Sequence, residues 1–150
     1  MLRITLAALH LLALAIGFGA VWRRATALNE TLTPGAVRRA LRADLDWGIA
    51  AGLLIVTGLW RYLGGIEKDT VYYNHNHAFL SKMGVLLLIL ALEMWPMLTL
   101  MRWRTVVAKG AAPESIANPT VARRIARISY LQALLVIVMV VLAVTMARGV

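Results

Sequence analysis

The sequence contains no cysteine. Without a thiol, this chain forms no disulfide, thiolate metal site, iron–sulfur cluster or thioether-linked c-type haem. Any bound metal must therefore use His, Met or carboxylate ligands, or belong to a ready-made cofactor. Acidic residues are also few, because 7 Asp and Glu stand against 16 Lys and Arg, which gives a formal net charge of +9.

This excess of basic residues does not indicate a nucleic-acid-binding protein. The Lys and Arg residues fall between long apolar runs, and the sequence has no stripe of interleaved basic and aromatic residues. Hydrophobic residues make up 61% of the 150 residues, and the mean hydropathy is +0.74. A soluble domain of this size needs far more polar surface. The composition predicts a membrane protein whose partner is the lipid bilayer, with no nucleic acid.

Four apolar segments are long enough to cross a bilayer as helices. They predict an all-α fold, a four-transmembrane-helix bundle that forms one domain over residues 1–150. The expected spans cover about residues 4–22, 47–63, 80–101 and 128–147.

The distribution of charge predicts how these spans are oriented. Most of the Lys and Arg residues lie in the connections 23–46 and 102–127. Arg23 and Arg24 follow the first apolar run, which indicates a retained helix rather than a cleaved signal peptide. The positive-inside rule places both connections in the cytoplasm and both termini on the non-cytoplasmic side. We therefore expect a multi-pass protein of a bacterial cell inner membrane.

The two basic connections contain a short internal repeat. The segments "PGAVRRALR" (34–42) and "PTVARRIAR" (119–127) share the pattern P-x-x-x-R-R-x-x-R, and each follows a helix-capping residue, Thr33 or Asn118. The repeat is consistent with two parallel helical hairpins that have a site between them. Alternatively, two cytoplasmic helix starts converged on similar chemistry. The small-residue pattern Gly48-x-x-x-Gly52 favours close helix packing, and the alternative is that it leaves room for a flat ligand. Helix faces of small residues also permit a homo-oligomer.

His10 is the ionisable residue of the first span and the first candidate ligand. An ionisable group at membrane depth is a functional candidate, because burying it without a partner is costly. The alternative is a neutral histidine bonded to a neighbouring helix. Trp60, Arg61 and Lys82 are expected in the same outer third of the bundle. There the imidazole would bind the iron of haem b, and the two cations would bind its propionates.

The other two histidines, His75 and His77, open the third span in the stretch "YYNHNHAFLSK" (72–82). A helix that begins at His75 would point the two imidazoles about 160° apart, so both could not approach one iron. One of them is then a candidate ligand. In an extended strand, both could instead hold a copper or zinc ion with His10. The third interpretation is a hydrated loop.

Glu93 lies in the third span three residues before Pro96, which interrupts the helical hydrogen-bond ladder. Its carboxyl group is either protonated and bonded across helices or part of a proton route. Both interpretations stay open from the sequence alone.

The segment 64–97, "GGIEKDTVYYNHNHAFLSKMGVLLLILALEMWPM", resembles an uncharacterised family of small bacterial predicted membrane proteins, as do "LLALAIGFGA" and "RRIARISYLQA" elsewhere. More distantly, His10 in "LAALHLLAL" and Lys82 in "LSKMGVLLLIL" are similar to HemJ-type protoporphyrinogen oxidases and CopD-like membrane proteins. That resemblance implies a b-type haem bound by the first-span histidine. Leu80 stands where the HemJ-type pattern has a histidine, so the resemblance does not extend to protoporphyrinogen oxidation.

Three functions therefore follow from the sequence. The first is a haem-b-binding membrane protein, a redox or electron-transfer component that would be an oxidoreductase if it is an enzyme. The second is a structural or assembly protein without a cofactor, in which His10 bonds to a neighbouring helix and the other histidines are exposed. The third is a protein for metal-ion transport or sensing.

Overall fold

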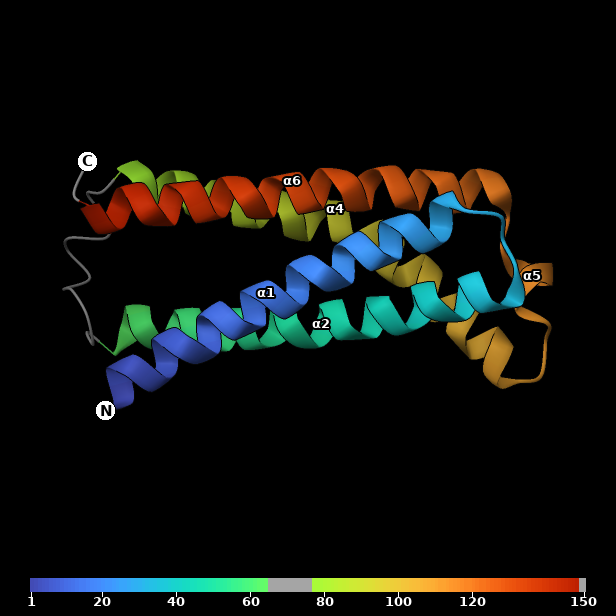
Figure 1. The fold of residues 1–150 in the computed structure, drawn as a ribbon, viewed down its shortest axis with the longest axis horizontal. Coiled ribbons are helices and arrows are strands. Elements are labelled where there is room, and N and C mark those ends of the chain that lie inside the picture. Colours follow the sequence, from blue (N-terminus) through green and yellow to red (C-terminus); the bar gives the residue numbers. More distant parts are fainter. Residues whose placement is uncertain (65–76, 149–150) are drawn as a thin grey trace.

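The computed structural model describes residues 1–64 and 77–148, and in these ranges all regular structure is helical. Four long helices are long and apolar enough to cross a membrane. The prediction of an all-α four-helix membrane bundle is confirmed (Figure 1). The helices are α1 (Leu2–Asn29), α2 (Pro34–Leu63), α4 (His77–Ala108) and α6 (Pro119–Arg148), with the short α5 (Pro113–Ile116) before α6.

Both repeat segments start a helix in the way that their capping residues predict. The Thr33 hydroxyl accepts a hydrogen bond from the Ala36 amide at 3.2 Å. The Asn118 side-chain oxygen accepts from the Thr120 amide at 2.9 Å. Each cap satisfies an amide that has no partner within its own helix, which explains why α2 and α6 begin at the prolines that follow.

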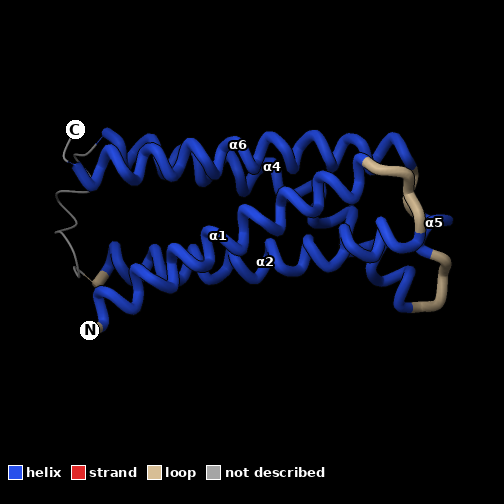
Figure 2. Tube along the Cα trace, in the orientation of Figure 1, coloured by secondary structure: helices blue, strands red, loops and turns tan. Residues whose placement is uncertain are grey.

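Each helix contains the corresponding predicted span and extends beyond it. The connection between α1 and α2 is therefore only residues 30–33, shown as a loop in Figure 2, and not residues 23–46. Arg23 and Arg24 belong to α1 rather than to a connection. This extension brings charged residues into contact between helices.

The helices form two antiparallel hairpins, α1 with α2 and α4 with α6 (Figure 1). The hairpins meet mainly where α1 packs along α6, whereas α2 and α4 have few contacts. The repeat relates α2 to α6, and therefore α1 to α4. Exact symmetry between the hairpins would make the α1–α6 interface equivalent to the α4–α2 interface. The relation between the hairpins is therefore only partial.

The two ends of the bundle differ in how well they are packed. We call the end with residues 30–33 and 109–118 the connection end, and the opposite end, where α1 begins and α6 finishes, the terminal end (Figure 1). One buried apolar cluster fills the connection end, and a second fills the middle. Their large members include Leu28, Val37, Leu100, Trp103 and Ile125 in the first and Val21, Trp47, Ile89 and Val136 in the second.

The terminal end has no comparable core. Where burial is described, no residue of α4 before Ile89 and none of α6 after Val136 is buried. In Figure 1 the two hairpins diverge toward this end. The side chains of the bundle thus cover one another at the connection end and only partly at the terminal end.

Candidate functional site

Arg24 of α1 is completely buried, with 0% of its side chain exposed. Its Nη1 donates to an oxygen of Asp44 on α2 at 2.9 Å and to an oxygen of Glu93 on α4 at 2.6 Å. Its Nη2 donates to the second Glu93 oxygen and to the Gln132 carbonyl oxygen, both at 2.8 Å. Its Nε donates to Ser129 at 2.9 Å. One guanidinium therefore contacts all the other long helices.

A second arginine completes this arrangement. Arg104 of α4 donates to the free oxygen of Asp44 and to the Leu41 carbonyl, each at 3.0 Å. Gln132 also donates to Glu93 at 2.8 Å. Two guanidinium charges offset two carboxylate charges within one connected set. We call this set the charge network, and its members are Arg24, Asp44, Glu93, Arg104, Ser129 and Gln132.

The charge network is saturated at its centre. A guanidinium has five N–H groups, and the five hydrogen bonds of Arg24 use all of them. Removing one arginine or one carboxylate would leave an opposite charge buried without its partner, whereas the intact set has no net charge. These hydrogen bonds and ion pairs are suited to holding the four long helices together.

Sequence reasoning missed the charge network. The sequence predicts that Arg24 lies in a connection and offers no cationic partner for Glu93, whereas in the structure the two form an ion pair. The partners of Arg24 lie 20 to 108 residues away in the sequence, so no local spacing marks them. One signal was available, because Glu93 and Gln132 are polar residues within the apolar stretches of α4 and α6.

His10 lies in the terminal half of α1 and contacts α2. Its Nδ1 is 2.7 Å from the Thr57 hydroxyl oxygen, and that hydroxyl donates its single hydrogen to the Leu53 carbonyl at 2.6 Å. With the hydroxyl hydrogen donated to the Leu53 carbonyl, the Thr57 oxygen accepts from His10 Nδ1–H. In this arrangement Nε2 carries the lone pair, and Nε2 is one of the two imidazole nitrogens through which histidine binds metals.

Small residues near His10 have different roles. A Cβ atom on Gly58 would meet His10 Cε1 at 3.4 Å, and one on Gly17 would meet the Ala50 Cβ at 3.2 Å. Gly17 therefore permits close contact between α1 and α2. Within the described part of the chain, nothing lies within 4 Å of a Cβ on Gly48 or Gly52. The expected close packing of those two glycines is wrong for a single chain.

The other candidate residues are only partly gathered at the terminal end. Arg61 and Lys82 are partly buried, and a Tyr62–Phe79 stack with ring centroids 5.6 Å apart joins the last turn of α2 to the first turn of α4. Trp60 is 53% exposed.

His77 is exposed at the start of α4. His75 falls outside residues 1–64 and 77–148, so its predicted role stays a prediction. Within those ranges, no three His, Cys, Asp or Glu side chains are grouped as a metal ion requires.

Residues 2–150 match the family described as "Predicted membrane protein (DUF2214)", and the chain belongs to this family. The match agrees with the resemblance to small predicted membrane proteins and with the four apolar helices. No curated protein and no solved structure matches the chain. The more distant similarity to HemJ-type and CopD-like proteins therefore stays a prediction.

Proposed function

We propose that this DUF2214 protein binds haem b at the terminal end, with His10 as an iron ligand, and acts as a redox or electron-transfer component. The observation that carries the proposal is the hydrogen bond from His10 to Thr57. It anchors an imidazole, with Nε2 as the nitrogen that would bind the iron, at the end of the bundle where the helices cover one another least. The location we propose is a bacterial inner membrane, with both termini on the non-cytoplasmic side.

The chain's residues fit an iron ligand at His10. A metal-bound histidine commonly donates its second ring N–H to a protein group, which fixes the ring plane and raises the basicity of the ligating nitrogen. Thr57 supplies that acceptor and is itself anchored to the Leu53 carbonyl. The pair is built across two helices, so the ring orientation depends on the α1–α2 hairpin.

The fit of the remaining candidates is uneven. Arg61 and Lys82 are both partly buried. Arg61 precedes Tyr62 in α2 and Lys82 lies one turn along α4 from Phe79, so both lie near the Tyr62–Phe79 stack. Two cations there suit the two propionates of a haem. Trp60 fits less well, since more than half of it is exposed.

A second axial ligand would come from His75 or His77. The exposure of His77 means that it would have to turn inward on binding. Bound haem would supply one-electron redox chemistry, and any enzymatic activity would be that of an oxidoreductase. The chain's own residues would hold the group, orient the ligating imidazole and keep water from it.

The visible absorption spectrum of the detergent-purified protein, before and after dithionite, tests this function. We expect a Soret band that shifts and sharpens on reduction, with stronger, split bands at longer wavelength if two axial ligands are present. His75→Ala and His77→Ala should affect these bands unequally. A protein that stays colourless after expression with a haem precursor would overturn the proposal.

The second candidate function is a structural or assembly role without a cofactor. It is favoured by one specific observation, since His10 is bonded to a neighbouring helix and His77 is exposed, as that interpretation predicts. A colourless protein with an intact fold would support it. Metal-ion transport or sensing ranks behind both, because Glu93 is already paired with Arg24.

A further inference from the structure

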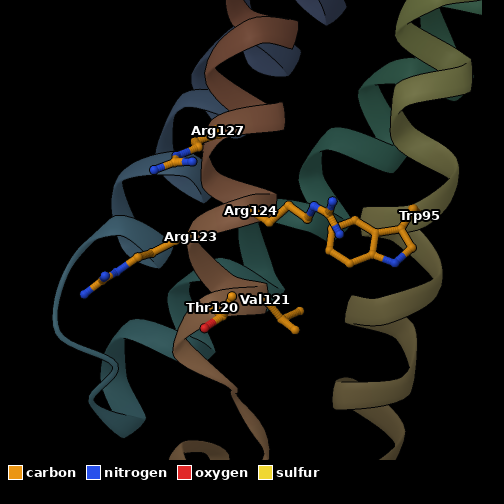
Figure 3. A pocket seen from close by; sticks show the side chains of 6 residues that line it. All are labelled: Trp95, Thr120, Val121, Arg123, Arg124 and Arg127. Carbon is orange, nitrogen blue, oxygen red and sulfur yellow. The ribbon is translucent and has the colours of Figure 1, made fainter.

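An open hollow of about 520 Å³ lies over the first turns of α6 near the connection end. In Figure 3, Arg124 reaches toward the Trp95 ring of α4, while Arg123 and Arg127 extend on the other side of α6. Thr120 lies between the two sides. The lining residues are Trp95, Thr120, Val121, Arg123, Arg124 and Arg127.

Within residues 1–64 and 77–148, the three arginines of this hollow lack a carboxylate partner, as do Arg38 and Arg42, whereas two other exposed arginines are paired. Arg23 pairs with Asp46 at 2.7 Å, and Arg39 pairs with Glu30 at 3.0 Å. Among the residues that the structure describes, Arg123, Arg124 and Arg127 form no ion pair with a carboxylate. Three uncompensated cations within five residues of α6 therefore attract an anion.

We propose that this hollow binds the phosphate headgroup of an anionic phospholipid. A guanidinium recognises phosphate through paired N–H groups as well as charge. Arg124 is already oriented, because its guanidinium carbon lies 5.6 Å from the centre of the Trp95 ring. Tryptophan is common at the depth of lipid headgroups.

The surface beside the hollow favours a lipid over a soluble anion. Leu131 lies seven residues beyond Arg124 on α6, and Leu88 lies seven residues before Trp95 on α4. Each leucine therefore lies on the same helix face as its hollow residue, about two helical turns closer to the membrane centre. Both leucines are exposed. They provide an apolar track for an acyl chain that free phosphate would not need.

The headgroup would be held by side chains rather than by the start of the helix. The Thr120 and Val121 amides already donate to Asn118, at 2.9 and 3.4 Å. This makes arginine substitution a clean test. The repeat also supplies a matched control, because Arg38, Arg39 and Arg42 have the same spacing in α2.

The test measures phosphatidylglycerol bound per chain by native mass spectrometry, with phosphatidylcholine as the neutral comparison. The two triple variants are Arg123→Gln/Arg124→Gln/Arg127→Gln at the hollow and Arg38→Gln/Arg39→Gln/Arg42→Gln as the control. We expect wild type and control to retain phosphatidylglycerol and the hollow variant to bind it at least about tenfold more weakly. Equal loss in both variants would overturn the proposal by reducing it to general surface charge.

Two further arms keep the proposal testable if the triple variant does not fold. Trp95→Leu keeps every charge and should still weaken phosphatidylglycerol binding several-fold, since Arg124 loses its ring contact. Unchanged affinity in this variant would count against the site. Inorganic phosphate is added at the concentration of the lipid, and competition equal to that of phosphatidylglycerol would identify a soluble-anion site and contradict the proposal.

Discussion

Two regions of this bundle use polar residues in opposite ways. Between the middle of the bundle and the connection end, the charge network joins four helices and uses every donor of a buried arginine. At the terminal end, His10 has a hydrogen bond that fixes its ring, among helices that cover one another only in part. A saturated network has no capacity for a ligand, whereas an anchored imidazole in a loosely packed region does. Burial of charge therefore marks what holds the fold, and incomplete packing marks where we propose that a ligand binds.

The largest effect on stability should follow from removing the central arginine of the charge network. Arg24→Met leaves Asp44 and Glu93 desolvated with too little positive charge, and we expect a loss of about 3–5 kcal/mol in the free energy of unfolding. Thermal unfolding of the detergent-solubilised protein would measure the loss.

A neighbouring arginine provides the control for that experiment. Arg23→Met removes an exposed pair with Asp46 and should cost about 0–1 kcal/mol. Adding Asp44→Asn and Glu93→Gln to Arg24→Met should restore part of the lost stability. If the triple variant were no more stable than Arg24→Met, the stranded carboxylates would not be the cause.

A smaller loss should come from the α1–α2 contact that positions His10. Gly17→Val places methyl groups against Ala50 and Trp47, where even a Cβ would be 3.2 to 3.4 Å from its neighbours. Overpacking of this kind typically costs about 1–3 kcal/mol. Gly48→Val has open space around it and should change the unfolding midpoint little. Equal destabilisation by both variants would refute the close contact at Gly17.

The anchor of His10 can be tested without removing the histidine. Thr57→Val deletes the acceptor of the Nδ1–H bond, and loss of such a partner typically weakens metal binding by about 10–100-fold. Haem titration followed at the Soret band would measure the affinity. Thr99→Val is a matched control, because its hydroxyl bonds within its own helix, to the Trp95 carbonyl. Unchanged affinity in Thr57→Val would remove Thr57 from the site.

The smallest effect should come from Trp60. Its exposure of 53% indicates contact with lipid rather than with a ligand inside the bundle. Trp60→Leu should leave haem content and the position of the Soret band unchanged. A shifted or weakened band would restore the role that the sequence predicted for Trp60.

The sequence was sufficient for the helices but not for their polar contacts. Apolar runs of membrane-spanning length predict four helices from composition alone, and Thr33 and Asn118 mark two of the starts through local capping chemistry. The charge network depends on residues from four helices, so it follows from packing rather than from spacing. Hydropathy also placed Arg24 outside the first span, although α1 continues to Asn29.

The candidate site was predictable in part for the same reason. His10 stands out as an ionisable residue in an apolar segment, whereas Thr57 is an ordinary residue of α2 until the two helices are packed together. The contact spans 47 residues of sequence. The homo-oligomer, the metal-ion role of the histidines and the orientation of the termini stay predictions.

The haem content of His10→Ala tests the central claim most directly, measured as haem per polypeptide together with the unfolding midpoint of the same preparation. The account predicts that haem is lost while the helical content is kept, because the charge network that joins the four helices does not include His10. A variant that retains all its haem, with an unchanged Soret band, would contradict His10 as the ligand and the assignment of the terminal end as the binding site.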